Sequence, residues 1–121
     1  MSKQCHYLAP EIVNFDLEIH WKKVDVWALG ISLWAMLFKS YPAWCFTETN
    51  EQNQKVFRHT NIHCPTFQMV CKRGELREFL EYNDIPFLPV HDLLQNMLRM
   101  DPQQRYSTEQ VLNHKWLREE R

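Results

Sequence analysis

The sequence predicts a mainly α-helical protein, a bundle of helices around one central buried helix. Apolar residues of segment 22–38 cover nearly every side of a helix, and a helix that is apolar all round belongs in a protein interior. Apolar residues of segment 90–98 recur at i, i+3, i+4, i+7 and i+8, which is typical of an amphipathic helix. No segment alternates apolar and polar residues convincingly, so strands are not expected. The 121 residues, 45% of them hydrophobic, suit one domain with a modest core.

The first part of this domain, residues 1–21, is expected to be mostly extended chain and loop. Residues 1–10 lack periodicity, and residues 11–15 could form a short helical turn before a polar loop. The central helix then covers 22–38 and has Asp25 in its first turn, where a carboxylate faces the positive end of the helix dipole. Pro42 ends the helical region.

Residues 39–89 are expected to hold loops and weak helices around one better-defined helix. Leu76 and Leu80 lie four residues apart and predict this helix over 73–82. The weaker segments are, in chain order, a loop over 43–50, a polar helix over 51–59 and an irregular stretch over 61–67.

Residues 90–121 are expected to form the terminal helices. Asp101 and Pro102 stop the amphipathic helix that begins near Val90. Ser107 is a suitable N-cap for the last helix, and Gln110 stands three residues later in the capping-box position. The inner face of that last helix is predicted to consist of Val111, Leu112, Trp116 and Leu117.

The composition argues against several classes of function. Lys and Arg number 14 against 15 Asp and Glu, so no excess of positive charge points to nucleic acid. The two glycines, Gly30 and Gly74, cannot form a glycine-rich phosphate loop. The longest apolar run, within 24–38, is too short to span a bilayer. No signal peptide is recognisable, and we expect an intracellular protein, cytoplasmic or nuclear, that does not engage a membrane.

The four cysteines form no C-x-x-C pair, and their favoured interpretation is reduced, partly buried thiols. The alternative is a zinc site, because His59 and His63 are four residues apart, as ligands on one helical turn are. Against zinc, Pro65 favours a loop there, and four such ligands can gather by chance. No metal site is therefore expected. The alternative site would consist of His59, His63, Cys64 and Cys71.

Four short motifs, in this order, resemble the C-terminal part of a eukaryotic Ser/Thr protein kinase domain. The resemblance is strongest to the calmodulin-dependent group, and it covers residues 4–59 and 90–118. Residues 60–89 are longer and more irregular than the family usually has there. The motifs are Tyr7–Glu11 for the A-P-E box, Asp25, Trp27 and Gly30 for the D-x-W-x-x-G box, Leu94–Arg105 for the closing box and His114–Leu117 for the end of the lobe.

The resemblance implies a fold and one structural ion pair. The fold is a partial kinase C-lobe, the helical lobe from the A-P-E box to the last helix. In the family the A-P-E glutamate pairs with the arginine of the closing box, which implies Glu11 against Arg105 here. A guanidinium suits this role because its planar fork binds a carboxylate through two hydrogen bonds. The alternative is two unpaired surface charges.

The resemblance also assigns roles near the catalytic loop and the substrate. In the family, Asp25 would accept hydrogen bonds from the backbone of the catalytic loop, and this sequence does not contain that loop. Its carboxylate is then an orphan unless a partner supplies the loop. Gln4, Cys5 and Leu8 would be the remnant of a substrate pocket. Gln4 departs from the family, which has a threonine in contact with the catalytic aspartate at that position.

The strings that carry the family's chemistry do not occur in this sequence. Phosphoryl transfer needs a lysine on the phosphates, an aspartate near the substrate hydroxyl, and an Asn and an Asp on magnesium. The family carries them in V-A-I-K, H-R-D-L-x-x-x-N and D-F-G strings. The nearest match, 91–96, lacks the arginine and is interpreted as helix surface. We therefore expect no catalytic residue and no bound ATP or Mg²⁺ in this chain alone, although the full-length family binds both.

Two interpretations of function follow. The first is a fragment of a Ser/Thr kinase domain whose full-length relatives transfer phosphate from ATP to protein hydroxyls. The second is a non-catalytic protein-binding module or pseudokinase-like regulator, because a lobe without its first half exposes apolar surface that can bind a partner or substrate protein. An unrelated helical domain with coincidental motifs is a third alternative.

Overall fold

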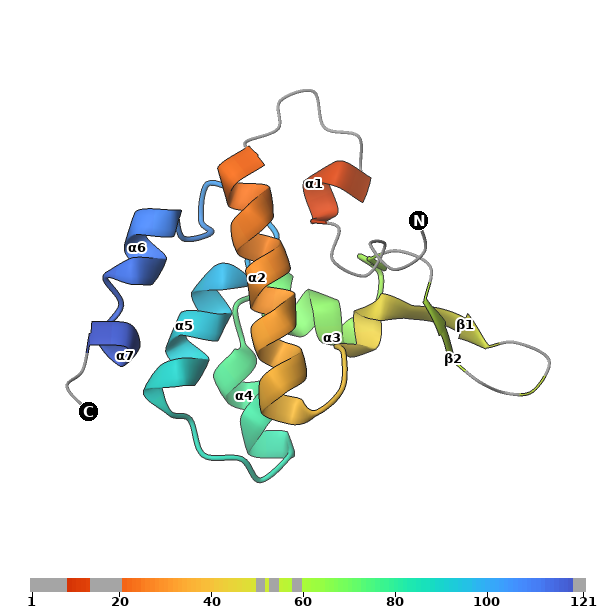
Figure 1. The fold of residues 1–121 in the computed structure, drawn as a ribbon. Coiled ribbons are helices and arrows are strands. Elements are labelled where there is room, and N and C mark those ends of the chain that lie inside the picture. The colour runs from red at the N-terminus through yellow and green to blue at the C-terminus, as the bar shows by residue number, and fades with distance from the viewer. Residues whose placement is uncertain (1–8, 14–20, 50–51, 53–54, 58–59, 119–121) are drawn as a thin grey trace.

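The structure is a computed structural model that describes residues 9–13, 21–49, 52, 55–57 and 60–118. Within these residues the fold is mainly α-helical, as predicted, with helices grouped around α2 (Trp21–Phe38). Figure 1 shows α1 (Pro10–Val13) beside the first turns of α2. The observed α2 begins one residue before the predicted central helix and ends at the predicted residue.

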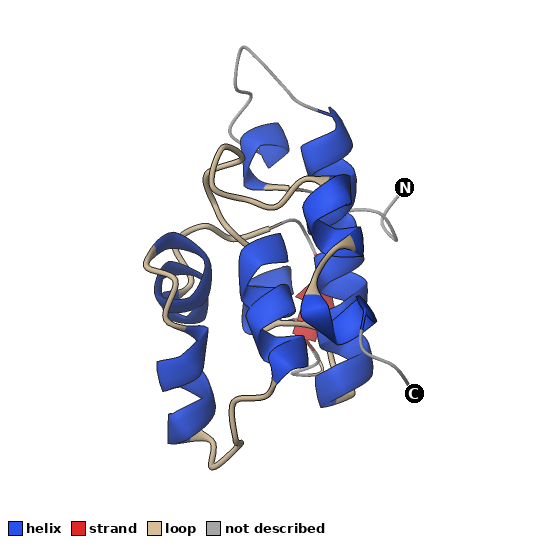
Figure 2. Ribbon diagram, turned by 90° about the vertical axis from the view of Figure 1, so that its left-hand side faces the viewer, coloured by secondary structure: helices blue, strands red, loops and turns tan. Residues whose placement is uncertain are grey.

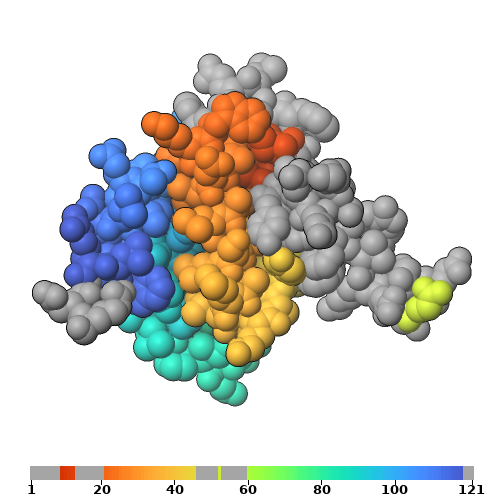
Figure 3. Space-filling view, in the orientation of Figure 1, coloured from red at the N-terminus to blue at the C-terminus, as the bar shows by residue number. Residues whose placement is uncertain are grey.

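Helix α2 is buried on one side only, which corrects the expectation of a helix buried all round. Its buried residues are Val26, Trp27, Gly30, Ile31 and Trp34. The other side forms part of the surface in Figure 3, where α2 runs across the face in orange. That side holds large apolar side chains with high exposed fractions, namely Trp21 at 65%, Leu29 at 55% and Met36 at 71%.

The start of α2 also differs from the prediction for Asp25. Because the helix begins at Trp21, its first turn holds no acidic residue, and Asp25 is the fifth residue of the helix. The predicted interaction with the helix dipole is wrong for this reason, since the dipole acts mainly within the first turn.

A short 3-10 helix, η2 (Ala43–Cys45), follows α2 and leads into a β-hairpin. Strand β1 (Phe46–Thr49) pairs antiparallel with β2 (Lys55–Phe57), and the register is irregular next to Phe46. The predicted loop over 43–50 and helix over 51–59 are therefore wrong. Phe, Thr and Val favour strands, and segment 51–59 has no apolar stripe that would hold a helix against the core.

Residues 60–89 are more helical than predicted. Helix α3 (Pro65–Phe67) forms where the end of the irregular stretch over 61–67 was expected, and it continues into η3 (Gln68–Lys72), a short π-helical segment. Proline suits the first position of a helix, because its missing N–H has no partner there. The predicted helix over 73–82 is confirmed as α4 (Leu76–Tyr82), and it starts late because Gly74, with φ of 71°, interrupts the chain before it.

The terminal helices are α5 (Pro89–Met97), α6 (Thr108–Leu112) and α7 (Lys115–Arg118). The predicted amphipathic helix is confirmed in α5. The capping box is confirmed as well, because Ser107 Oγ accepts from Gln110 N at 3.2 Å and Gln110 Oε1 accepts from Ser107 N at 2.8 Å. The prediction of a single last helix is wrong, because the helix is interrupted between α6 and α7. Leu112 was predicted to lie on the inner face, but it is 62% exposed.

The core consists of two apolar clusters that meet at Leu33. The larger cluster contains aromatic rings in contact, with ring centroids of Trp27 and Phe67 6.0 Å apart and those of Trp34 and Trp44 5.2 Å apart.

In Figure 2 the two strands, in red, lie behind the helices. No helix among the described residues is long and apolar enough to cross a membrane. The smaller cluster consists of Val26, Leu93, Met97 and Val111.

Candidate functional site

Glu11 of α1 and Arg105, between α5 and α6, form a buried ion pair. Arg105 Nη1 donates to Glu11 Oε2 at 2.7 Å, and Nη2 donates to Glu11 Oε1 at 2.8 Å. The side chains are 0% and 1% exposed for Arg105 and Glu11, respectively. The structure thus brings together the two residues that the kinase resemblance pairs, in the two-bond geometry that a guanidinium favours.

The Arg105 guanidinium also contacts the first turns of α2 and the segment that precedes Arg105 in the chain. It donates to the carbonyl oxygens of Lys23 at 2.9 Å, Arg99 at 3.0 Å and Met100 at 3.4 Å. Its Cζ lies 5.1 Å from the ring centroid of Trp27, within the range of a cation–π contact. A buried charge needs this many partners, because an unpaired one is strongly destabilising. Arg105 therefore fastens α1, the start of α2 and the 99–105 segment to one another.

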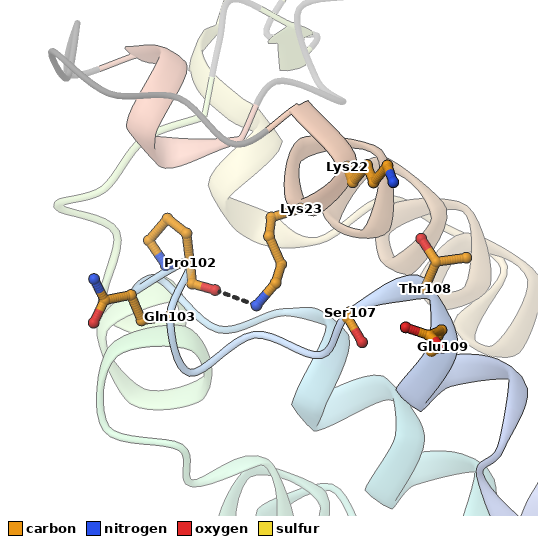
Figure 4. A pocket seen from close by; sticks show the side chains of 7 residues that line it. All are labelled: Lys22, Lys23, Pro102, Gln103, Ser107, Thr108 and Glu109. Atoms are coloured by element: carbon orange, nitrogen blue, oxygen red, sulfur yellow. Dashed lines mark hydrogen bonds between the residues drawn. The ribbon is translucent and has the colours of Figure 1, made fainter.

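Lys23 completes this junction and borders a surface pocket of about 370 Å³ (Figure 4). Its Nζ donates to the carbonyl oxygens of Pro102, at 2.8 Å, and of Arg105. Burial lowers the pKa of Lys23, the Arg105 charge lowers it further, and Asp101 opposes the shift. Because the ammonium is bonded to backbone carbonyls, it stabilises the 102–105 turn.

Asp25 is exposed, away from the buried side of α2. No described residue donates a hydrogen bond to its carboxylate. Its family role, holding the catalytic loop, stays a prediction. Gln4, Cys5 and Leu8 lie outside the described residues, so the substrate-pocket remnant stays a prediction too.

The described part of the chain contains no cluster of three His, Cys, Asp or Glu side chains that could hold a metal ion. His59, one member of the alternative zinc set, lies outside that part. Cys45 and Cys71 are buried. Burial raises the pKa of the Cys45 thiol to about 12 and that of Cys71 well above its usual value. Both thiols are therefore protonated at neutral pH in the folded chain.

Segment 91–96 is similar to a catalytic-loop string in sequence, but it is part of α5 and packs in the fold. The interpretation as helix surface is wrong for His91, which is 5% exposed, accepts from Leu88 N at 2.9 Å and stacks 6.1 Å from Phe38. Helical periodicity would have placed His91 next to the apolar face of α5, since it follows Val90 directly. Burial lowers the pKa of His91.

A second histidine, His114, joins α5 to the start of α7, and the motif at 114–117 did not predict its partner. His114 Nε2 lies 2.8 Å from Asp92 Oδ2, and Trp116 N donates to His114 Nδ1 at 3.0 Å. Because Nδ1 accepts a hydrogen bond, Nε2 holds the proton and donates to the carboxylate. The pair is separated by 22 residues, so only the folded chain brings it together.

Comparison with known proteins places these features in a family. The family model described as "Protein kinase domain" matches residues 2–117. Calcium-dependent protein kinase 19 of Arabidopsis thaliana is 28% identical over 118 residues, which covers 94% of this chain and 17% of that protein. Calcium-dependent protein kinase 1 of Oryza sativa subsp. japonica is 27% identical over 121 residues, covering 95% of this chain and 18% of the relative.

Solved structures show the same fold. The structure described as Rad53 kinase domain and SCD2 superposes with a TM-score of 0.61 at 19% identity, covering 98% of this chain and 39% of that one. Rad53 1–466 in complex with AMP-PNP gives a TM-score of 0.55 at 21% identity, with 92% and 25% covered. The chain thus spans well under half of each relative and structure that it resembles.

Proposed function

Because this chain belongs to the protein kinase domain family, we propose that it serves as the C-terminal scaffold of a Ser/Thr protein kinase and has no catalytic activity alone. In the whole protein, phosphate would pass from ATP to Ser or Thr hydroxyls of protein substrates, at an intracellular location. The observation that carries the proposal is the Glu11–Arg105 pair, buried and bonded through two hydrogen bonds. It ties the end of an activation segment to the last helices, as the family resemblance implies.

The chemistry of the described junction supports the proposal that the chain alone is inactive. A kinase site needs a lysine on the phosphates and acidic or amide groups on magnesium. In the described junction, Lys23 donates to two backbone carbonyls and Glu11 is paired with Arg105. Neither side chain is therefore free to bind a phosphate or magnesium. ATP and Mg²⁺ would then be bound by residues outside this sequence.

The exposed side of α2 is where the rest of a kinase domain would dock. Leu29 and Met36 offer apolar surface, and Asp25 offers a carboxylate. In this proposal, Asp25 accepts hydrogen bonds from the backbone of the catalytic loop, the role that the family resemblance implies.

Titration of the purified chain with ATP and Mg²⁺ tests the proposal, with thermal unfolding as the measurement. We expect no saturable shift of Tm, because the strings that carry the family's phosphate and magnesium ligands do not occur in this sequence. An intact Ser/Thr kinase domain under the same conditions is the positive control and should show a shift. A saturable shift in this chain would overturn the proposal.

The second candidate function is a non-catalytic protein-binding module, favoured by the same exposed side of α2. An evolved module should be monodisperse at micromolar concentration, whereas a scaffold that lacks its cover should self-associate through that side. Sedimentation velocity distinguishes them. In the scaffold case, Leu29→Gln with Met36→Gln should reduce association, and Leu112→Gln, which removes a similarly exposed leucine from α6, should not.

A further inference from the structure

A second pocket lies between the C-terminal end of α2 and α4, two elements that approach each other in Figure 1. Its volume is about 440 Å³. Residues of α2 and of the turn after it line one side, and Thr66, Phe79, Asn83 and Ile85 line the other. The pocket is remote from the Glu11–Arg105 junction, and none of the residues that line it takes part in the proposed kinase function.

One side of this second pocket is built by the segment in which the sequence departs from the kinase family. Thr66, Phe79 and Asn83 all belong to residues 60–89, which are longer than the family usually has there. Both helices end beside the pocket with a residue in the left-handed region, Lys39 after α2 with φ of 61° and Asp84 after α4 with φ of 58°. Neither helix therefore continues across the opening.

The lining is aromatic and carries no charge. The ring centroid of Trp34 lies 4.7 Å from that of Phe38 and 5.5 Å from that of Phe79. Ser40, Thr66 and Asn83 add hydroxyl and amide groups. The Asn83 amide is oriented by a hydrogen bond from its Nδ2 to the Phe79 carbonyl at 2.8 Å.

We propose that this pocket binds a small, neutral, aromatic molecule. Its volume lies within the range of small-molecule sites, which are mostly apolar and have a few polar groups that fix orientation. An aromatic ligand would add ring contacts to apolar burial. An anionic or cationic ligand would enter without a charged partner, because none of the side chains that line the pocket is charged.

Three matched compounds test the ligand class with the 121-residue chain. They share a two-ring skeleton: 1-naphthol is neutral and aromatic, naphthalene-1-sulfonate is aromatic and anionic, and decahydro-1-naphthol is neutral and saturated. Binding is followed by amide chemical shifts in NMR spectra. We expect saturable binding of 1-naphthol, with shifts at Ser40, Thr66 and Asn83, and at least tenfold weaker binding of the other two. Equal binding of all three, or shifts centred on Leu29 and Met36, would overturn the proposal.

Two substitutions that fill the pocket test its position. Ala43→Phe and Asn83→Phe each place a ring at an exposed lining position and should weaken 1-naphthol binding at least tenfold. Asn113→Phe is the matched control, because Asn113 is also an exposed asparagine at a helix C-cap, that of α6. Shift dispersion verifies folding for each variant. If either filling variant is folded and binds like the control, the pocket is not the site.

Discussion

Removing the buried carboxylate of Glu11 should destabilise the fold more than removing any single charge at an exposed position. In Glu11→Ala, Arg105 stays buried with its 2.7 Å and 2.8 Å hydrogen bonds to Glu11 lost. Breaking a buried pair by removing one partner costs about 3–5 kcal/mol. Two hydrogen bonds to a charged group, at about 1.5–3 kcal/mol each, give a similar figure. We therefore expect the free energy of unfolding to fall by about 4 kcal/mol.

Urea unfolding followed by circular dichroism measures this loss. With an m-value of about 2 kcal/mol/M, the midpoint should move down by roughly 2 M. The Arg73–Glu75 pair offers a matched control, because its 2.9 Å distance is similar while its side chains are 55% and 39% exposed. Glu75→Ala should cost less than about 1 kcal/mol.

A double-mutant cycle separates the coupling free energy of the Glu11–Arg105 pair from the other effects of each substitution. Glu11→Leu with Arg105→Met replaces both partners by apolar groups, and the double variant should lose clearly less stability than the two single variants added together. A coupling free energy below about 0.5 kcal/mol, or a loss in Glu11→Ala no larger than in Glu75→Ala, would refute the reasoning.

Three further predictions concern other buried groups. A Cβ at Gly30 would lie 2.8 Å from Leu98 Cδ2, so Gly30→Ala should lose about 1–3 kcal/mol in urea unfolding, and unchanged stability would contradict this. The pKa of His91 is lowered from 6.5, so the unfolded chain binds a proton at a higher pH than the folded chain does. The free energy of unfolding should therefore fall as pH drops below about 6.5. His91→Gln should weaken that pH dependence, as unfolding at several pH values can show. Cys45, with a pKa of about 12, should be alkylated at least tenfold more slowly than the partly exposed Cys64 at pH 8, as mass spectrometry of each site can show.

Local patterns predicted the elements that depend on neighbouring residues. The periodicity of α5 and the capping box of Ser107 and Gln110 both lie within a few residues of sequence, where spacing alone determines the geometry. The Glu11–Arg105 contact spans 94 residues, and only the resemblance of two distant motifs to a family could suggest it. Periodicity contains no information about which distant charge a buried arginine meets.

Features that depend on tertiary contact could not be predicted in this way. The partner of His114 is set by where α7 lies against α5, and the sequence motif described only a helix end. The α2 side that stays exposed also carries large apolar residues, namely Trp21, Leu29 and Met36. The hydropathy of segment 22–38 predicts that both sides of the helix favour burial. It does not predict whether other segments of the chain pack against both sides.

That uncovered side limits how a partner could bind it. Full burial of a large apolar side chain stabilises by about 1.5–3 kcal/mol, so completing the burial of Trp21, Leu29 and Met36, each more than half exposed, would contribute about 3–6 kcal/mol. Association itself costs about 4–15 kcal/mol in lost motion. The apolar contacts alone are therefore too weak for a stable complex, and a partner must add directed bonds. Asp25 lies on the same helix, and a partner that presents backbone N–H groups to its carboxylate would supply charge-assisted hydrogen bonds of about 1.5–3 kcal/mol each. Binding of such a partner should accordingly weaken more in Asp25→Asn than in Met36→Gln, and the reverse order would indicate a purely apolar contact.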